Sequence, residues 1–278
     1  YDMHPDMYIE DALTEAEAEE GYVLTCQMIP ESDCVIKVPT SSEACKVGKS
    51  VFKGKLQQLN VLSESTIHFG VEVDNPDALV FLPGQYVNVS IPDSNETRSY
   101  SFSSIPSANQ AEFVVRNIPN GKMSTFLSDT ATIGQEINFE GPFGSFYLRP
   151  LIRPTLFLAG GTGIAPFLSM LKSLEVSGAH HPVRMVYGVT NDFDLIEVEK
   201  LEEVKQNHPW FDYRTCVATE DSQHERKGYV TGHVDNEWLN DGDVDVYLCG
   251  PLGMVDAVSN WLDSSNLKPS NFYYEKFT

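Results

Sequence analysis

The stretch Thr155-Leu156-Phe157-Leu158-Ala159-Gly160-Gly161-Thr162-Gly163-Ile164-Ala165-Pro166 decides the fold of the carboxyl half of the chain. Its first five residues are an apolar run that predicts a buried strand, and the glycines predict a tight loop before a helix. Such a loop lets the backbone approach a pyrophosphate, and the helix N-terminus offers it unpaired N–H groups. The candidate nucleotide contacts are therefore Gly161, Thr162, Gly163 and Pro166. A tight turn that binds nothing is the alternative, because Pro166 replaces the last glycine of the dehydrogenase pattern G-x-G-x-x-G.

Strands and helices alternate through the rest of this half. A helix is expected at 166–174, with Pro166 at its first position, where the missing N–H costs nothing. Further strands are expected at 183–188, 213–218 and 244–249, and further helices at 194–206 and 254–262. Helices between strands are typical of βαβ units. Residues 153–278 are therefore expected to form an α/β domain with a parallel sheet.

A second loop, Cys249-Gly250-Pro251-Leu252-Gly253-Met254, follows the fourth strand. In open α/β sheets the ligand lies beyond the carboxyl ends of the strands. Cys249, Gly250, Pro251 and Met254 are therefore candidate nucleotide contacts. A lone cysteine at such a place is more often a small hydrophobic residue than a reactant, and that alternative stays open.

The loop after the second strand bears on the choice of nucleotide. It contains the carboxylates Asp192 and Asp194 and no basic residue. A carboxylate such as Asp192 can accept hydrogen bonds from free ribose hydroxyls but repels a 2′-phosphate, so NADH is expected over NADPH. Arg226 and Lys227, after the third strand, are the counter-evidence, although acidic residues surround them.

Residues 46–152 have a different pattern. Strands rich in β-branched and aromatic residues are expected at 86–91, 97–102 and 112–116, with one helix candidate at 124–128. Strands at this spacing, broken by Pro-Gly and Asn-Gly turns, favour a small antiparallel barrel.

Two polar clusters mark a candidate site on this barrel. On the strand 97–102, Arg98 and Tyr100 are expected on one face, with Ser99 and Ser101 on the other. An arginine beside an aromatic ring suits a ligand with a phosphate and a flat ring, although a plain exposed strand face is the alternative. The second cluster, Gly121-Lys122-Met123-Ser124, opens the helix candidate and predicts another anion site.

Composition excludes several classes of function. Lys and Arg number 19 against 40 Asp and Glu, a net charge of −21. So acidic a surface repels phosphate backbones, and no nucleic-acid partner is expected. No apolar run reaches the roughly 18 residues of a membrane span and no signal peptide is recognisable, so no membrane partner is expected either. Five cysteines without a C-x-x-C pair predict reduced thiols in a cytoplasmic protein.

Residues 1–45 form a third segment, with 11 acidic residues and one basic residue. A helix is expected between Thr14 and Gly21, followed by strands at 22–26 and 34–39. So short a segment cannot bury a core alone, so it is either docked or incomplete. A solubilising acidic surface is the alternative.

Residues 46–278 resemble the ferredoxin–NAD(P) reductase superfamily. That superfamily pairs a flavin-binding barrel, with an R-x-Y-S strand and a G-x-x-S helix start, with a nucleotide domain that carries G-G-T-G-x-x-P and C-G-P-x-x-M. All four motifs stand here in that order. The resemblance implies an antiparallel six-stranded β-barrel that binds FAD, an α/β parallel-sheet domain that binds NAD, and hydride transfer from NADH to the flavin.

The resemblance also implies roles for single residues. Arg98 would contact the FAD pyrophosphate, and Tyr100 would pack on the isoalloxazine ring. The catalytic candidates are Ser101 near flavin N5, Cys249 near the nicotinamide and Phe277 over the flavin face. The implied FAD set is Arg98, Ser99, Tyr100, Ser101, Val115, Arg116, Gly121, Lys122, Met123, Ser124, Thr162 and Phe277, and the implied NAD set is Gly161, Thr162, Gly163, Pro166, Asp192, Cys249, Gly250, Pro251 and Met254.

The acidic segment also carries a resemblance, because Leu24-Thr25-Cys26-Gln27 is similar to the end of a plant-type ferredoxin. Residues 1–45 would then be the remainder of an α+β [2Fe–2S] ferredoxin domain, with Cys26 as one metal ligand. The other three ligand cysteines are absent, so we expect the cluster loop to precede Tyr1 in a longer parent chain.

A ferredoxin ahead of a flavin reductase resembles the electron-transfer components of benzoate, toluate and anthranilate dioxygenases. That resemblance implies electron flow from NADH through FAD and the [2Fe–2S] cluster to a terminal oxygenase that acts on an aromatic ring. The alternatives are a reductase that serves a monooxygenase or a haem acceptor, and a non-catalytic regulatory module that binds flavin or nucleotide.

Overall fold

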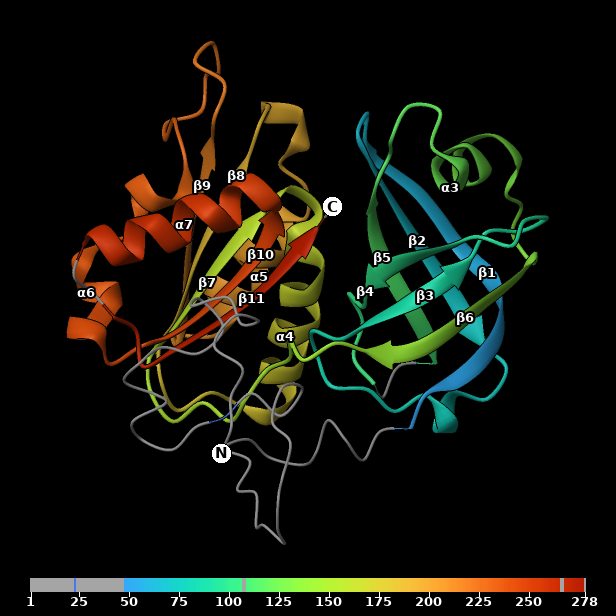
Figure 1. The fold of residues 1–278 in the computed structure, drawn as a ribbon, viewed down its shortest axis with the longest axis horizontal. Coiled ribbons are helices and arrows are strands. Elements are labelled where there is room, and N and C mark those ends of the chain that lie inside the picture. Colours follow the sequence, from blue (N-terminus) through green and yellow to red (C-terminus); the bar gives the residue numbers. More distant parts are fainter. Residues whose placement is uncertain (1–22, 24–47, 107–108, 266–267, 278) are drawn as a thin grey trace, which may run out of the picture. The chain divides into compact units, whose positions relative to one another are not determined.

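The computed structural model describes residues 23, 48–106, 109–265 and 268–277 (Figure 1). The helix and strands expected within residues 1–45 lie outside the described residues, apart from Val23. From Ser50 onward the chain forms first an antiparallel barrel and then a parallel sheet flanked by helices.

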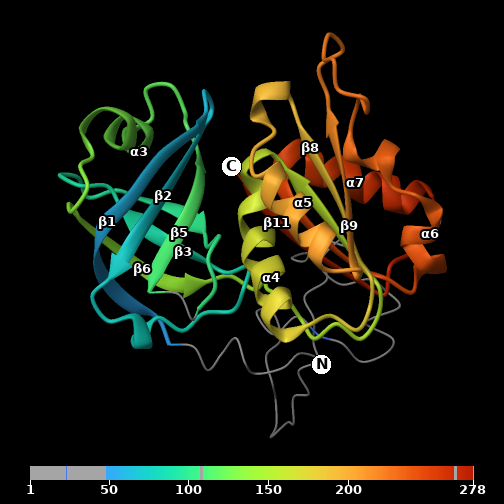
Figure 2. The ribbon, with the colours of Figure 1, turned by 180° about the vertical axis from the view of Figure 1, so that it is seen from behind.

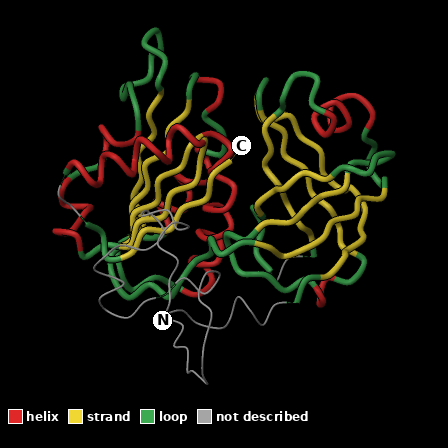
Figure 3. The backbone as a smooth tube through the Cα atoms, in the orientation of Figure 1, coloured by secondary structure: helices red, strands yellow, loops and turns green. Residues whose placement is uncertain are grey.

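The barrel has six strands in the order β4-β3-β6-β1-β2-β5, with every neighbouring pair antiparallel. An isolated bridge between Phe102 and Phe113 links the two ends of the sheet, and Figure 3 shows the strands wrapped around a common interior. The six-stranded antiparallel prediction is confirmed, although the sequence pattern located only three strands. The strands are β1 (Ser50–Ser63), β2 (Thr66–Val73), β3 (Tyr86–Ser90), β4 (Thr97–Ser101), β5 (Gln110–Arg116) and β6 (Glu136–Phe143).

Aromatic rings fill the barrel interior, where Phe81 stacks on Phe102 with ring centroids 3.7 Å apart. The predicted helix 124–128 begins earlier, because α3 spans Lys122–Thr125 and continues as a π-helical turn, η3 (Phe126–Thr130). Met123 and Leu127 from this segment pack into the barrel core, which fixes Lys122 at the rim.

The second sheet has five parallel strands in the order β11-β10-β7-β8-β9. Four of them were predicted. The fifth, β11, lies beyond the last predicted helix, at the carboxyl end of the described chain. The strands are β7 (Thr155–Gly160), β8 (Val183–Val189), β9 (Phe211–Val217), β10 (Asp245–Pro251) and β11 (Asn271–Phe277).

Helices cover both faces of this sheet (Figures 1 and 2). One apolar cluster joins the sheet to α4 (Ile164–Ser177) and α5 (Val198–Asn207), and the other joins it to α6 (Asn236–Leu239) and α7 (Leu252–Ser264). Burial on both sides explains the continuous apolar runs of β7 and β10. The short 3₁₀ helices are η2 (Pro76–Ala78), η4 (Gly161–Gly163), η5 (Asp192–Asp194), η6 (Val230–His233) and η7 (Asn240–Gly242).

All three predicted helix starts in this domain are wrong, and α7 begins at Leu252 rather than at Met254. Helix α4 begins at Ile164, so Pro166 is its third residue; an N–H there would still lack a helical partner, so the proline is tolerated. Helix α5 begins at Val198 rather than at 194, because Glu197 has a left-handed backbone (φ 58°) and 192–194 is a separate 3₁₀ turn.

Polar contacts connect the barrel to the parallel sheet domain. Ser169 on α4 donates to the Ser104 carbonyl oxygen at 2.5 Å, and Lys172 pairs with Glu112 at 2.8 Å. Asp194, only 3% exposed, accepts from the Ser65 hydroxyl of the barrel. These contacts hold α4 and the loop after β8 against the barrel.

No helix in the described part of the chain is long and apolar enough to span a membrane.

We expect Asp194→Ala to lower the free energy of unfolding by about 1–3 kcal/mol, because the partly buried hydroxyl of Ser65 and the side-chain amide of Asn191 lose their acceptor. Urea denaturation measures the change. Glu199→Ala, at an exposed position in the first turn of α5, is the control and should change little. Equal stability of the two variants would contradict the assignment of Asp194 as a structural anchor.

Candidate functional site

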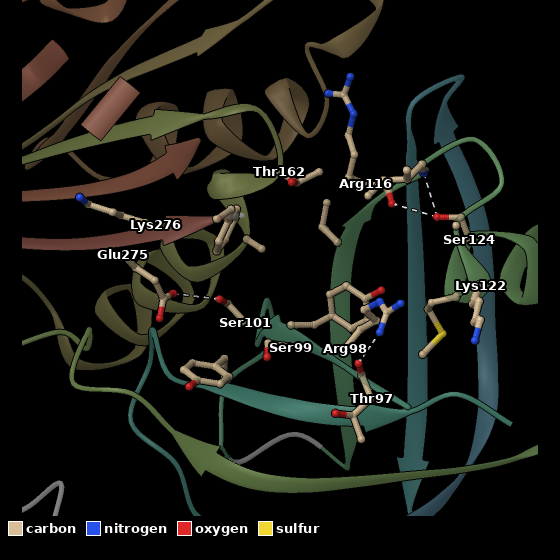
Figure 4. A pocket seen from close by; sticks show the side chains of 18 residues that line it. Thr97, Arg98, Ser99, Ser101, Arg116, Lys122, Ser124, Thr162, Glu275 and Lys276 are labelled. Atoms are coloured by element: carbon tan, nitrogen blue, oxygen red, sulfur yellow. Dashed lines mark hydrogen bonds between the residues drawn. The ribbon is translucent and has the colours of Figure 1, made fainter. Parts of the chain in front are cut away.

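A cavity of about 540 Å³ lies where the barrel meets the α/β domain (Figure 4). This size is within the range of roughly 300–1,000 Å³ typical of small-molecule sites. Strands β4 and β5, helix α3, the glycine loop and β11 all contribute side chains to its wall. The lining residues are Tyr86, Thr97, Arg98, Ser99, Tyr100, Ser101, Val114, Arg116, Ile118, Gly121, Lys122, Met123, Ser124, Thr162, Ala165, Glu275, Lys276 and Phe277.

Every residue of the implied FAD set lines this cavity except Val115. On β5 the period of two turns Val115 into the barrel core together with Phe113, and Val114 faces the cavity instead. The expected division of β4 into two faces does not describe the cavity either. Because β4 is an edge strand, the cavity reaches both of its sides, and Arg98 through Ser101 all line it.

Cations gather at the barrel end of the cavity (Figure 4). The Arg98 guanidinium and the Lys122 ammonium both contact the carboxylate of Glu96, which precedes β4. Ser124, a member of the implied FAD set, lines the cavity and also accepts from the Ile118 amide at 2.8 Å, which holds the turn before α3. Two positive charges that share one carboxylate therefore line the cavity.

An acidic group that the sequence analysis missed lies at the opposite end. Glu275 on β11 accepts from the hydroxyl of Ser101 on β4 at 3.2 Å, and the two side chains point toward each other in Figure 4. Burial raises the pKa of Glu275 to about 7, and the Ser101 hydrogen bond only partly offsets that rise. The residue is therefore a carboxyl group that exchanges a proton near neutral pH.

Strand β11 connects this cavity to the predicted nucleotide loops. Its parallel register with β10 sets Glu275 opposite Cys249 and Phe277 opposite Pro251. The side chains of Glu275 and Phe277 at the same time line the cavity beside the barrel. One strand therefore lines the cavity and also pairs with the strand that leads into the second predicted nucleotide loop.

The two predicted nucleotide loops lie against each other at the carboxyl ends of β7 and β10. Gly161 has a positive φ of 55°, and a Cβ at Gly163 would overlap the Cys249 carbonyl oxygen. A Cβ at Gly160 would likewise overlap the sulfur of Met254. Glycine is therefore required here for close backbone approach, which is what a dinucleotide loop needs.

The thiol of Cys249 is fully buried, and burial, reinforced by Glu275, raises its pKa well above the usual thiol range. A neutral buried thiol is a poor nucleophile. Cys249 therefore contributes shape and a backbone carbonyl to this edge of the sheet, rather than a reactive thiolate.

Asp192 lies apart from the cavity, in the loop after β8. Its carboxylate is exposed and accepts from the Ser222 hydroxyl at 2.7 Å. Arg226 and Lys227, the two cations that could bind a 2′-phosphate, already have partners in the protein. Arg226 pairs with Glu225, and Lys227 donates to the Glu220 carbonyl oxygen at 2.9 Å.

The donor set fits a flavin dinucleotide. The cavity offers two cations for a diphosphate at one end, and at the other the aromatic residues Tyr100 and Phe277 with the Ser101 hydroxyl near them. Burial raises the pKa of Tyr100 to about 12, so its ring stays neutral. Among the described residues no group of three His, Cys, Asp or Glu could hold a metal ion, and Cys26 lies outside them.

We expect Glu275→Gln to stabilise the flavin-free protein increasingly as pH rises. The folded pKa of Glu275 is raised from 4.5 to about 7, so a buried negative charge develops across that interval and stability is lost. Because the side chain is only half-buried, the gain of the variant over the wild type should grow by about 1–3 kcal/mol between about pH 5 and about pH 8.

Urea denaturation at the two pH values measures this gain. Glu136→Gln, at an exposed site on β6, is the control and should show a constant difference. A Glu275→Gln difference that is also constant would show that Glu275 has an ordinary pKa.

Comparison with known proteins shows two matching families. The oxidoreductase FAD-binding domain family matches residues 53–147, and the oxidoreductase NAD-binding domain family matches residues 157–260. The structure is similar to the crystal structure of a cytochrome P450 reductase from Amycolatopsis, with a TM-score of 0.75 and 24% identity over 100% of this chain and 84% of that one. At that identity the similarity concerns the fold alone.

Two curated relatives are closer in sequence. The chain is 50% identical to the toluate 1,2-dioxygenase electron transfer component of Pseudomonas putida, over 97% of this chain and 80% of the relative. It is 48% identical to the 2-halobenzoate 1,2-dioxygenase electron transfer component of Burkholderia cepacia, with the same coverage. The two domains of this chain line one cavity, and its sequence is similar to these relatives. The chain therefore belongs to the ferredoxin–NAD(P) reductase superfamily, in the family of FAD- and NAD-binding electron transfer components of dioxygenases.

Proposed function

We propose that this protein takes electrons from NADH through FAD and a [2Fe–2S] cluster to a terminal dioxygenase that acts on a benzoate-type aromatic ring. One observation carries the reductase half of the proposal: a single cavity brings barrel side chains against the glycine loop and against β11. The names of the relatives, which are components of toluate and halobenzoate dioxygenases, support the choice of acceptor.

The barrel side of the cavity holds the flavin in this proposal. Arg98 and Lys122 bind the diphosphate, because both present donors from the barrel rim. Tyr100 packs against the ring system, and Phe277 covers it from the β11 side. FAD, when bound there, supplies chemistry that no side chain can, since it accepts two electrons and releases them one at a time.

The carboxyl ends of β7 and β10 hold the NADH in this proposal. The backbone of Gly163 lies too close to the Cys249 carbonyl for a side chain between them, and the nicotinamide end binds beside this contact in the proposal. Thr162 lines the flavin cavity and belongs to the nucleotide loop, so it lies near both cofactors. Gly161, Pro166, Gly250, Pro251 and Met254 shape this surface without charge.

Ser101 and Glu275 handle protons in this proposal. The Ser101 hydroxyl donates to Glu275 Oε2, and the carboxyl group can keep or release a proton because its pKa is about 7. A carboxyl group with such a pKa can take up or release a proton when the charge of the bound ligand changes.

We further propose three domains, residues 1–45 as the remainder of a [2Fe–2S] ferredoxin with Cys26 as one ligand, residues 46–152 for FAD and residues 153–278 for NAD. The similarity of Leu24-Thr25-Cys26-Gln27 to ferredoxins supports the first of them. A cytoplasmic location is part of the proposal, supported by the free thiols of Cys216 and Cys249.

The test of the acceptor uses the natural full-length protein with its cofactors bound. With a purified benzoate-type oxygenase, NADH consumption should match the formation of the dihydroxylated product. Faster reduction of a haem protein or of a monooxygenase would favour those acceptors. If NADH does not bleach the flavin colour without oxygen, the protein is a regulatory module instead.

We expect Arg98→Ala to weaken FAD binding with the fold retained. Loss of one charge-assisted contact costs about 1.5–3 kcal/mol, or about 10- to 150-fold in the dissociation constant. Titration of the flavin-free protein with FAD, followed by flavin fluorescence, measures it. Lys55→Ala removes a cation from β1, outside the cavity, and should bind as the wild type does. Full FAD occupancy of Arg98→Ala at sub-micromolar concentration would rule out this placement of Arg98.

We expect the protein to prefer NADH to NADPH and Asp192→Ala to narrow that preference. Without the carboxylate, NADH loses an acceptor for its ribose hydroxyls and NADPH loses a repulsion, so the ratio of kcat/KM values should fall about ten-fold or more. Steady-state kinetics with both nucleotides measure the ratio, and Glu237→Ala, an exposed charge on α6, is the control. Equal kcat/KM for the two nucleotides in the wild type would contradict the role of Asp192.

A further inference from the structure

Glu96 occupies a particular place beside the flavin cavity without lining it. It is the last residue before β4, at the end of the loop that joins β3 to β4. Its amide donates to the Ser94 hydroxyl at 3.1 Å, and its carbonyl oxygen accepts from the Ile91 amide at 2.9 Å. The backbone of Glu96 is therefore held by the loop, while its side chain is 43% exposed and can turn into solvent.

The carboxylate of Glu96 bridges the two cations to which the diphosphate is assigned. Its Oε2 lies 3.2 Å from Arg98 Nη2, and its Oε1 accepts from Lys122 Nζ. These contacts, that of Lys122 above all, hold the pKa of Glu96 below its usual range, so the group is an anion at neutral pH. An anion of the protein thus already contacts both cations to which the diphosphate is assigned.

Each of the other cations in the cavity wall has a carboxylate of its own among the described residues. Arg116 lies 3.8 Å from Asp194, and Lys276 lies 3.4 Å from Asp256. Among the described ion pairs of this cavity, only Glu96 serves two cations at once. Removal of this one carboxylate would therefore unmask both positive charges at the barrel rim.

We propose that Glu96 is an internal competitor of the flavin diphosphate, which neutralises Arg98 and Lys122 in the flavin-free protein and is displaced by the incoming phosphates. This inference rests on the proposed placement of the diphosphate on Arg98 and Lys122. Glu96 is a positioning residue, because it acts on the flavin through the two cations.

The competition has a physical cost to binding. A diphosphate must break two existing ion pairs, and the displaced carboxylate remains a like charge on the adjacent loop. All three side chains are partly exposed, so water and salt screen these charges and the effect is moderate rather than large. Glu96 therefore lowers the affinity for the flavin and stabilises the flavin-free site, because Arg98 and Lys122 keep a carboxylate partner when FAD is absent.

The test compares ligands with and without phosphate on the flavin-free protein. Glu96→Gln should bind FAD about five-fold more tightly than the wild type, with a steeper loss of affinity as salt is added, because two unmasked cations then meet the diphosphate. Riboflavin, which has the ring but no phosphate, should bind both proteins equally. Glu96→Asp, which keeps the charge, should behave as the wild type, and Glu136→Gln controls for the loss of one negative charge elsewhere on the barrel.

Each other outcome overturns the inference. Unchanged or weaker FAD binding by Glu96→Gln would mean that the carboxylate is inert or orients the cations for the flavin. An equal change for riboflavin would show an effect on the fold of the barrel rim. If Arg98→Ala and Lys122→Ala both leave FAD binding unchanged, the proposed placement of the diphosphate is wrong, and the competition that depends on it is wrong as well. If those two variants weaken binding and Glu96→Gln does not tighten it, only the competition fails.

Discussion

The hydrogen bond from Ser101 to Glu275 joins the barrel to the last strand of the parallel sheet, across 174 residues of sequence. Ser101 ends the edge strand of the barrel, and Glu275 lies on the edge strand of the parallel sheet. An edge strand has one side free of main-chain pairing, so each can present its side chains to a ligand. This contact links the two sheets in the wall of the cavity.

The position of β11 follows from the same constraint. Parallel pairing with β10 fixes its register, and the register sets the aromatic Phe277 beside Pro251 while it also reaches the cavity wall. The nucleotide loops and the flavin cavity therefore share a wall made of one strand. A ligand ring in the cavity and a nucleotide on the loops can meet without a large movement of either domain. The contacts Ser169–Ser104 and Lys172–Glu112 hold α4 and the barrel in that arrangement.

Much of this arrangement could be predicted from local pattern. The glycine loop after an apolar strand, the Cys249–Met254 loop and the Arg98–Ser101 strand are short segments whose residue types are dictated by backbone approach, charge or burial. The structure brings the implied flavin residues to one cavity, with the exception of Val115. Strands β7, β8 and β10 were predictable because burial on both faces leaves long apolar runs, and the edge strand β9 was predictable from the alternation of strands and helices.

The rest depends on contacts between distant segments. Glu275 has no local pattern that marks it as functional, since its raised pKa comes from burial against a barrel 174 residues earlier in the sequence. Val114 and Val115 are both buried and β-branched, so the choice between core and cavity follows only from the pairing of β5. Strand β2 carries the buried His68, so a polar residue interrupts its apolar pattern. The charged neighbours of His68 are Glu112 of the barrel and Lys172, Glu197 and Lys200 of the second domain.

The position of FAD in a crystal structure of the flavin-loaded protein tests the central claim most directly. The account predicts the diphosphate between Arg98 and Lys122, and the ring system between Tyr100 and Phe277 with the Ser101–Glu275 pair beside it. FAD bound elsewhere, or bound in this cavity with the ring at the Lys122 end, would contradict it.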